Sequence, residues 1–333
     1  MQSTDKSNMF SMIQGWSDQL AEGLKLVELV DICRPITKIV LIGVGGSAWP
    51  ADLVNCVFAD DIKVPVVINR GYRLTTPVDA STLVIVNSYS GNTEETLSAY
   101  QEALKTSGQI VAMSAGGRLL ELAQRGSQQF ARVPKPSPNF PPRMACGYII
   151  GALTALYIKA GVLPLASDRL LTEAADYLTK LNAEGQGKQL GESLLRTIPV
   201  FYAAGSYWPL AEVAKIQLNE NTKIPAFFNQ IPEFNHNEMA GFINTKDNYR
   251  IVIFRDPSDD PRINRQIDVA AALLRERPIG LKTTIWDMPG DTRAKKALST
   301  ILTAIWASYY LAMAMGVDPG ELKLVDSFKQ LSK

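Results

Sequence analysis

Short apolar runs alternate with longer amphipathic stretches along the chain. Runs of β-branched and aliphatic residues are typical of buried strands, and stretches with apolar residues three or four positions apart are typical of helices. In the first half of the chain the predicted strands lie at 38–42, 64–69, 83–87, 110–113 and, at a sheet edge, 129–133. Because helical stretches separate them, the pattern predicts a parallel, doubly wound α/β sheet.

The helices expected in this half lie at 9–30, from about residue 49, at 96–105 and at 144–160. The Pro-rich run 134–142 precedes the last of them. It can be neither helix nor central strand, because proline has no N–H donor. We therefore expect a loop there that ends the first domain.

The second half repeats this organisation. After a long helical pattern at 168–190, the predicted strands are 198–202, 251–254 and 281–286. The order Gly, Ser, Trp, Pro follows the first strand of each half, at 46–50 and 205–209, with a constant offset of 159 residues. Such a repeat predicts two similar α/β domains in tandem, residues 1–160 and 161–333, with helical additions at both termini.

Composition narrows the kind of protein and partner. A chain of 333 residues has room for two domains, and 46% apolar with 20% charged residues is typical of a globular protein. A net charge of +1 without a Lys/Arg cluster favours a small-molecule partner over nucleic acid. The three cysteines, Cys33, Cys56 and Cys146, have no metal or disulfide spacing. That favours a reducing cytoplasm, with each cysteine a small buried side chain.

Two features bear on membranes. The N-terminus lacks the basic-then-apolar pattern of a signal peptide. The uncharged stretch 297–317 is long enough to span a membrane, but it contains serines, threonines, tyrosines and many alanines. We expect it to be a buried helix of an α/β domain, and we expect no membrane partner.

The stretch Ser88-Tyr89-Ser90-Gly91-Asn92-Thr93 lies where a predicted strand gives way to a helix. Backbone N–H groups at a helix N-terminus lack intrahelical partners and favour an anion, and hydroxyl donors suit a phosphate monoester. Serine and threonine also cap helices. Three small hydroxyls within six residues exceed what one cap requires, so the stretch predicts a phosphate site.

A glycine turn at 43–48 follows the first strand and is expected to face the same crevice, because ligands of open α/β sheets bind beyond the carboxyl ends of the strands. It resembles a dinucleotide fingerprint, but Asp60 and Asp61 precede the second strand and are misplaced for a ribose. A close backbone approach with Ser47 as a donor is the favoured interpretation. Arg143, after the proline loop, is either a substrate contact or a surface charge.

In the second half, the segments 218–225 and 233–241 are dense in residues that move protons or bind hydroxyls. Glu220 and Glu238, taken singly, are typical of solvated surface acids. Together with His236, the only histidine of the chain, they favour an active site. The spacing of Glu233, His236 and Glu238 does not resemble a metal-binding motif.

These motifs together resemble the bifunctional phosphoglucose/phosphomannose isomerases, which belong to the phosphoglucose isomerase superfamily and consist of two sugar-isomerase (SIS) domains. The resemblance covers nearly the whole chain. The Ser-Tyr-Ser-Gly-Asn-Thr motif at 88–93 marks SIS domains generally, whereas Asn-Glu-Asn at 219–221 and Asn-His-Asn-Glu at 235–238 are more specific to this family.

The resemblance implies a cofactor-free and metal-independent interconversion of glucose 6-phosphate, or mannose 6-phosphate, with fructose 6-phosphate. Glu220 would be the base that moves a proton between C1 and C2, His236 would assist ring opening and Arg143 would stabilise the enediolate. A lysine near the C-terminus also takes part; Lys329 is the best match and Lys323 the competitor. The residues implied in substrate binding are Gly46, Ser47, Ser88, Ser90 and Thr93.

The resemblance also implies a homodimer whose histidine reaches into the partner's active site. One departure bears on substrate range. Relatives that accept mannose 6-phosphate offer a threonine about two helical turns before the lysine, and 320–323 has no hydroxyl. The mannose activity therefore stays open.

Two other functions remain as alternatives. A sugar-phosphate-sensing SIS protein would keep the 88–93 motif without needing Glu220 or His236. Another SIS isomerase, such as the isomerase half of an amidotransferase acting on glucosamine 6-phosphate, is disfavoured because no cysteine near the N-terminus could serve a glutaminase.

Overall fold

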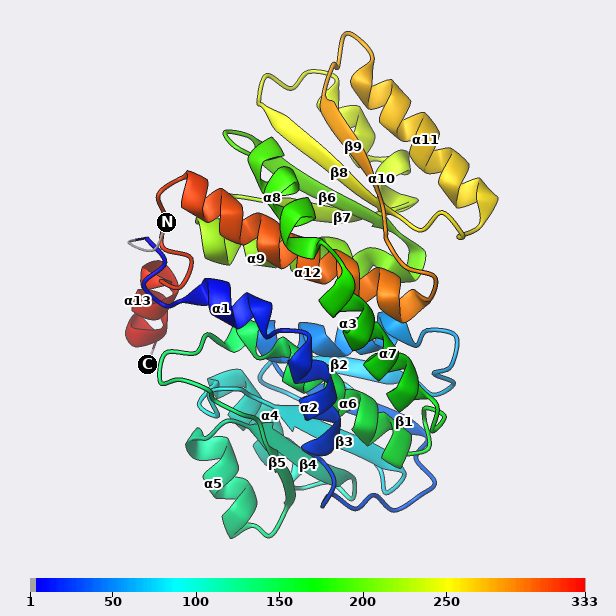
Figure 1. The fold of residues 1–333 in the computed structure, drawn as a ribbon. Helices are drawn as coiled ribbons and strands as arrows, with labels where there is room; N and C mark the ends of the chain where they lie inside the picture. The colour runs from blue at the N-terminus through cyan, green and yellow to red at the C-terminus, as the bar shows by residue number, and fades with distance from the viewer. Residues whose placement is uncertain (1–3, 333) are drawn as a thin grey trace. The chain divides into compact units, whose positions relative to one another are not determined.

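The structure, a computed structural model, describes residues 4–332 and consists of two compact units (Figure 1). The first unit is Gly15–Thr179. The second contains Lys180–Lys333 together with Met1–Gln14, as far as these are described. Each unit holds one parallel sheet, so the fold is α/β as expected.

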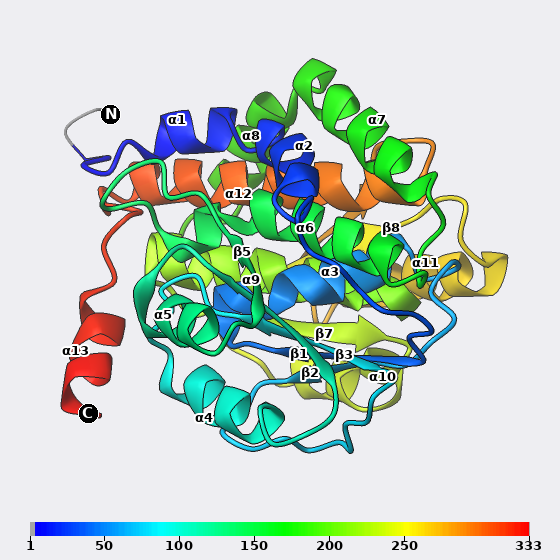
Figure 2. The same ribbon diagram turned by 90° about the horizontal axis from the view of Figure 1, so that it is seen from below.

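The division between the units differs from the expected boundary at 160/161. The N-terminal helix α1 (Met9–Gln14) belongs to the second unit because it packs on the long helix α12 (Arg293–Ala314). The Phe10 ring lies 5.2 Å from that of Trp306 and 5.8 Å from that of Tyr309, measured between centroids. Figures 1 and 2 both show α1 alongside α12.

The sheet of the first unit has five parallel strands in the order β2-β1-β3-β4-β5. All five strands predicted from the sequence are present, with β5 at an edge. Every residue of the central strand β3 is buried, which explains its unbroken apolar run. The strands are β1 (Lys38–Ile42), β2 (Val66–Asn69), β3 (Thr82–Asn87), β4 (Gln109–Ser114) and β5 (Gln129–Arg132).

Helices cover both faces of this sheet. In Figure 2, α4 lies on one side of it and α3 and α6 on the other. The expected helix at 9–30 is broken at 15–17, where the buried Trp16 indole donates to Cys146 Sγ at 3.0 Å. The helices are α2 (Asp18–Lys25), α3 (Trp49–Val57), α4 (Glu94–Ala103), α5 (Gly117–Arg125), α6 (Cys146–Lys159) and α7 (Ser167–Lys180).

The second unit has a four-stranded parallel sheet in the order β7-β6-β8-β9. Three of these strands match the sequence prediction, and β7 was missed. Its residue Phe227 is 51% exposed and polar Asn229 and Gln230 follow, so no apolar run marks it. The strands are β6 (Ile198–Ala204), β7 (Phe227–Ile231), β8 (Tyr249–Arg255) and β9 (Lys282–Asp287).

The long helical pattern before β6 forms two helices, α7 and α8. Helix α12 passes the length and apolarity test for a membrane span, but 83% of its apolar window is buried inside the structure. The expectation of a buried helix is therefore confirmed. The remaining helices of the unit are α8 (Ala183–Ser193), α9 (Trp208–Thr222), α10 (Glu233–His236), α11 (Pro261–Arg275) and α13 (Lys323–Leu331).

The internal repeat corresponds to a shared strand–turn–helix motif. β1 leads through the 3-10 turn Gly45–Ser47 into α3, and β6 leads through Gly205–Tyr207 into α9. Gly45 and Gly205 have positive φ of 54° and 51°, which favours glycine at both positions. Each helix begins at a Trp-Pro pair, but the glycine with positive φ lies four residues before the tryptophan in the first turn and three before it in the second.

Candidate active site

The candidate residues fall into two groups, one in each unit. In the first unit the glycine turn after β1 is joined to the end of β3. Asn87 Nδ2 donates to the Ser47 carbonyl at 2.7 Å, and the Tyr89 N–H donates to Ser47 Oγ at 3.1 Å. These bonds bring Ser47 beside Ser88 and join the turn after β1 to the end of β3.

The hydroxyl groups of Ser88 and Thr93 form a cluster instead of a helix cap. Ser88 is fully buried, and its Oγ lies 3.1 Å from Thr93 Oγ1. Thr93 occupies the N-cap position of α4, yet its side chain makes no capping hydrogen bond. The exposed Ser90 accepts two local hydrogen bonds from Asn92, one from the backbone N–H to Oγ and one from Nδ2 to the carbonyl, both at 3.2 Å. The first turn of α4 therefore has no side-chain cap.

Two residues of the motif hold its shape. Gly91 has φ of 70°, and a Cβ at this position would lie 1.8 Å from the Gly116 carbonyl oxygen. Asn92 Oδ1 accepts the Arg118 N–H at 3.1 Å, and the Gly91 carbonyl accepts the Leu119 N–H at 2.9 Å. The motif is thus bound to the start of α5. This contact was not predicted from the sequence.

Arg143 is not a surface charge. It lies in the 3-10 turn Pro142–Met144 and is only 2% exposed. The turn packs on the glycine turn, since a Cβ on Gly46 would lie 3.6 Å from the Arg143 backbone nitrogen. The proline loop is also held by Tyr89, whose hydroxyl donates to the Pro134 carbonyl at 3.0 Å. Burial raises the pKa of Tyr89, which keeps this donor protonated.

In the second unit, Glu220 lies in the last turn of α9, between two asparagines with structural contacts. Asn219 Nδ2 donates to the Ile224 carbonyl at 2.9 Å, which closes the C-terminus of the helix. The fully buried Asn221 donates to Ser308 of α12 at 2.8 Å. Both contacts fix the end of α9 and leave Glu220 partly exposed. The Asn-Glu-Asn motif therefore combines a candidate base with two anchors.

His236 is the last residue of α10, and its side chain is exposed. It lines a surface hollow of about 430 Å³ together with Met239 and Leu273. Glu238, two residues on, is not a solvated surface acid. Its carboxylate accepts hydrogen bonds from Tyr202 Oη, at 2.6 Å, and from Asn229 Nδ2.

Both candidate lysines lie on α13, which buries none of its described residues. Lys323 pairs with Glu321 at 2.8 Å, and that carboxylate raises the pKa of Lys323. Lys329 lies six residues further along the same helix, and its side chain is exposed.

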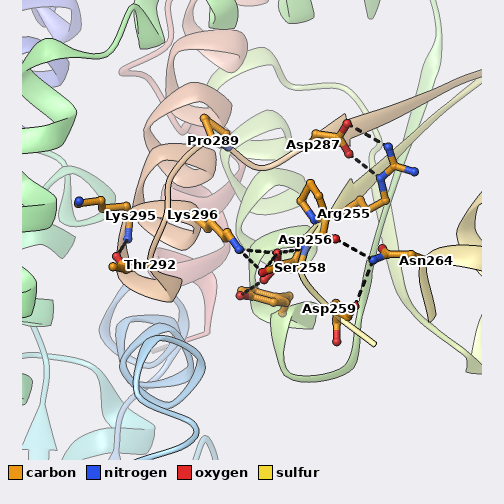
Figure 3. A network of polar contacts seen from close by, with 12 residues as sticks. Arg255, Asp256, Ser258, Asp259, Asn264, Asp287, Pro289, Thr292, Lys295 and Lys296 are labelled. Atoms are coloured by element: carbon orange, nitrogen blue, oxygen red, sulfur yellow. Dashed lines mark hydrogen bonds and ion pairs between the residues drawn. The ribbon is translucent and has the colours of Figure 1, made fainter. Parts of the chain in front are cut away.

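The second unit carries the carboxylate of Asp256 in a network of polar contacts after β8 (Figure 3). By sheet order β8 corresponds to β3, and Asp256 follows it directly. Asp256 accepts bonds from Lys296 Nζ at 2.5 Å and from Tyr207 Oη, of the repeated turn, at 2.7 Å. Burial alone would raise the pKa of Asp256, but the bonds from Lys296, Tyr207 and Ser258 outweigh it and lower the pKa to about 2. The Asp256 carboxylate therefore lies after β8 at the position that Ser88 occupies after β3.

No group of three or more His, Cys, Asp and Glu side chains is arranged to hold a metal ion among residues 4–332. Of the three cysteines, Cys56 and Cys146 are buried as expected, whereas Cys33 is exposed and corrects that expectation.

Comparison with known proteins supports the α/β fold of both units and gives a family match for the second. Residues 183–331 match the family model described as bacterial phospho-glucose isomerase C-terminal SIS domain. In solved structures, the C-terminal domain of glucosamine-fructose-6-phosphate aminotransferase from Francisella tularensis shares the fold. The TM-score is 0.70 at 15% identity, over 96% of this chain and 99% of that one.

Two curated relatives bear on activity. A bifunctional phosphoglucose/phosphomannose isomerase of Caldicellulosiruptor bescii is 32% identical, over 96% of this chain and 98% of its own. A D-glucosamine-6-phosphate 4-epimerase of Sulfolobus acidocaldarius is 29% identical, over 88% of each chain. With 32% identity over nearly its whole length, the chain belongs to the family of bifunctional phosphoglucose/phosphomannose isomerases.

Proposed function

We propose that this protein is an aldose–ketose isomerase that interconverts glucose 6-phosphate, and also mannose 6-phosphate, with fructose 6-phosphate. Family membership supports this reaction. The observation that carries it onto this chain is the buried hydroxyl cluster at the carboxyl ends of β1 and β3. Ser88 and Thr93 lie 3.1 Å apart there, beside a helix N-terminus without a side-chain cap. A phosphate monoester is the anion that this arrangement suits.

In the proposed mechanism Ser47, Ser88, Ser90, Thr93 and the backbone of Gly46 bind the phosphate. His236 helps to open the sugar ring. Glu220 then removes the C2 proton of the aldose and returns it to C1, through an enediol. Arg143 stabilises the negative charge that develops on oxygen, and Lys329 assists from α13. A positioned base of this kind contributes roughly 10²–10⁴-fold to the rate.

Proton transfer next to a carbonyl is chemistry that side chains can perform, so the proposal includes no cofactor or metal. We further propose a cytoplasmic homodimer in which each His236 serves the partner's site. The free cysteines fit a reducing compartment. The exposed position of His236, beside an apolar hollow that includes Leu273, fits a role at an interface.

The 4-epimerase relative makes epimerisation of an amino sugar phosphate the second candidate. Both reactions would use the same phosphate site, but an epimerase acts at C4 and leaves the C1–C2 pair unchanged. Side-by-side assays on fructose 6-phosphate and glucosamine 6-phosphate separate the two.

The proposal is tested by following glucose 6-phosphate formation from fructose 6-phosphate in a coupled assay with EDTA present. We expect turnover by the wild type and a loss of about 10²-fold or more in kcat for Glu220→Gln. Glu192→Gln is the matched control, since it removes an exposed carboxylate from α8 of the same unit. Binding of the sugar phosphate without turnover by the wild type would favour a sensor. Full activity of Glu220→Gln would exclude Glu220 as the base.

A further inference from the structure

The segment that carries His236 is built from short elements. α10 has four residues and the 3-10 helix Glu238–Phe242 has five. Helices of this length do not hold their shape by themselves. The exposed imidazole of His236 therefore depends on other contacts for its position.

Those contacts come from two adjacent strands of the second sheet. Tyr202 of β6 and Asn229 of β7 are register partners, so their side chains project from the same face of the sheet. Both reach Glu238: Tyr202 Oη donates to Oε1 at 2.6 Å and Asn229 Nδ2 donates to Oε2. Each carboxylate oxygen is thus held by a different strand, through hydrogen bonds of the stronger, charge-assisted kind.

Tyr202 also holds the segment on the other side of His236. Its ring lies 4.2 Å from that of Phe234, measured between centroids, and Phe234 is fully buried. Residues 234 and 238, two before and two after His236, are therefore both bound to one side chain. Tyr202 itself is fully buried. Burial, followed by the bond to Glu238, raises its pKa, so the hydroxyl remains a donor at neutral pH.

We propose that Tyr202, Glu238 and Asn229 form a clamp that positions His236. The purpose of the clamp rests on the proposed function, in which His236 helps to open the sugar ring. In this account Glu238 is a positioning residue and does not itself act on the substrate. The sheet supplies the rigid support, and the clamp transmits it to an otherwise weakly held segment.

The single histidine allows a direct test that does not depend on activity. With ¹³C-labelled histidine, the full-length protein gives one imidazole signal, from His236. We expect Tyr202→Phe to increase the mobility of this imidazole and to move its chemical shift. Tyr310→Phe is the matched control, because Tyr310 donates to Glu184 at 2.5 Å in the same unit without contacting the clamp. An unchanged His236 signal in Tyr202→Phe would overturn the clamp.

Kinetics then test whether the clamp acts through His236. We expect Tyr202→Phe to lower kcat about 10- to 100-fold, since small displacements of a catalytic group have effects of that size. In a His236→Ala background the same substitution should change kcat by no more than about twofold. Equal losses in both backgrounds would show that Tyr202 acts independently and would overturn the proposal.

Conservative substitution separates positioning from chemistry at Glu238. Glu238→Gln keeps an oxygen that can accept from Tyr202, so its kcat should lie between those of the wild type and Glu238→Ala. Equal inactivity of the two variants would mean that the carboxylate itself reacts, and would overturn the positioning role. A wild type without any isomerase activity would refute the proposed function, whereas the NMR comparison would still decide whether the clamp orders His236.

Discussion

Gly91 is the position in the phosphate motif where the backbone requires glycine most strictly. A Cβ there would lie 1.8 Å from the Gly116 carbonyl oxygen, at a φ of 70°. We expect Gly91→Ala to reduce the free energy of unfolding by at least about 1–2 kcal/mol, the cost of left-handed backbone for an L-residue. It should also raise KM for fructose 6-phosphate. Gly71→Ala is the control, since a Cβ at Gly71 meets no atom within 4 Å. Equal unfolding midpoints in denaturant would contradict the account.

At the scale of single residues, the sequence predicted where the hydroxyl groups lie but not the surroundings of the charged side chains. Ser88 and Thr93 were predictable because the order of strand, turn and helix fixes where they lie. Arg143 was not, because its burial arises from the packing of two distant turns. The contacts of Glu238 were not predictable because its partners, Tyr202 and Asn229, are remote in sequence. Long-range pairing of polar side chains leaves no local pattern.

Among the elements, the strands were predicted best. Central parallel strands such as β3 are apolar throughout because both faces are covered. The edge strand β7 has no such run, and it was missed. The single helix expected at 9–30 is in fact two helices, α1 and α2, and the side chain of Trp16 between them is buried in the core. α1 then packs on α12, almost 300 residues away in sequence, which no local pattern could reveal.

The network that joins the repeated turn, the end of β8 and α12 predicts a dependence of stability on pH. The pKa of Asp256 is lowered to about 2 in the fold, below the usual value of 3.8. Its stabilisation is therefore complete above pH 4 and is lost as the pH falls toward 2. The difference corresponds to about 2 kcal/mol. The stability difference between wild type and Asp256→Asn, from urea unfolding, should shrink between pH 5 and pH 2. A constant difference would contradict this.

Helix α13 should matter for activity and not for stability. It buries none of its described residues and carries both candidate lysines. Ending the chain after Leu322 should therefore shift Tm by less than about 2 °C. The same truncation should abolish turnover, and Lys329→Ala should lower kcat much more than Lys323→Ala. A large fall in Tm would show that α13 stabilises the fold, and the reverse order of the two variants would assign the role to Lys323.

At the scale of the whole molecule, the two similar domains have different roles in the proposed mechanism. The first unit has the hydroxyl cluster of Ser88 and Thr93 after β3, whereas in the second unit the corresponding position holds the Asp256–Lys296 pair. In the proposed account the first unit binds the phosphate, and the second contributes Glu220, His236 and the C-terminal lysine. The Gly-Ser-Trp-Pro repeat could be recognised in the sequence. The difference between the two domains after β3 and β8 could be recognised only from the side-chain contacts.

The central claim is proton transfer between C1 and C2 of a hexose 6-phosphate. It is tested most directly by incubating the wild-type protein with fructose 6-phosphate in D₂O with EDTA and following the products by NMR. The account predicts glucose 6-phosphate that carries deuterium at C2 to the extent that the proton on Glu220 exchanges with solvent, and an unlabelled C4 of unchanged configuration. Absence of glucose 6-phosphate, or inversion at C4 with C2 unlabelled, would contradict it.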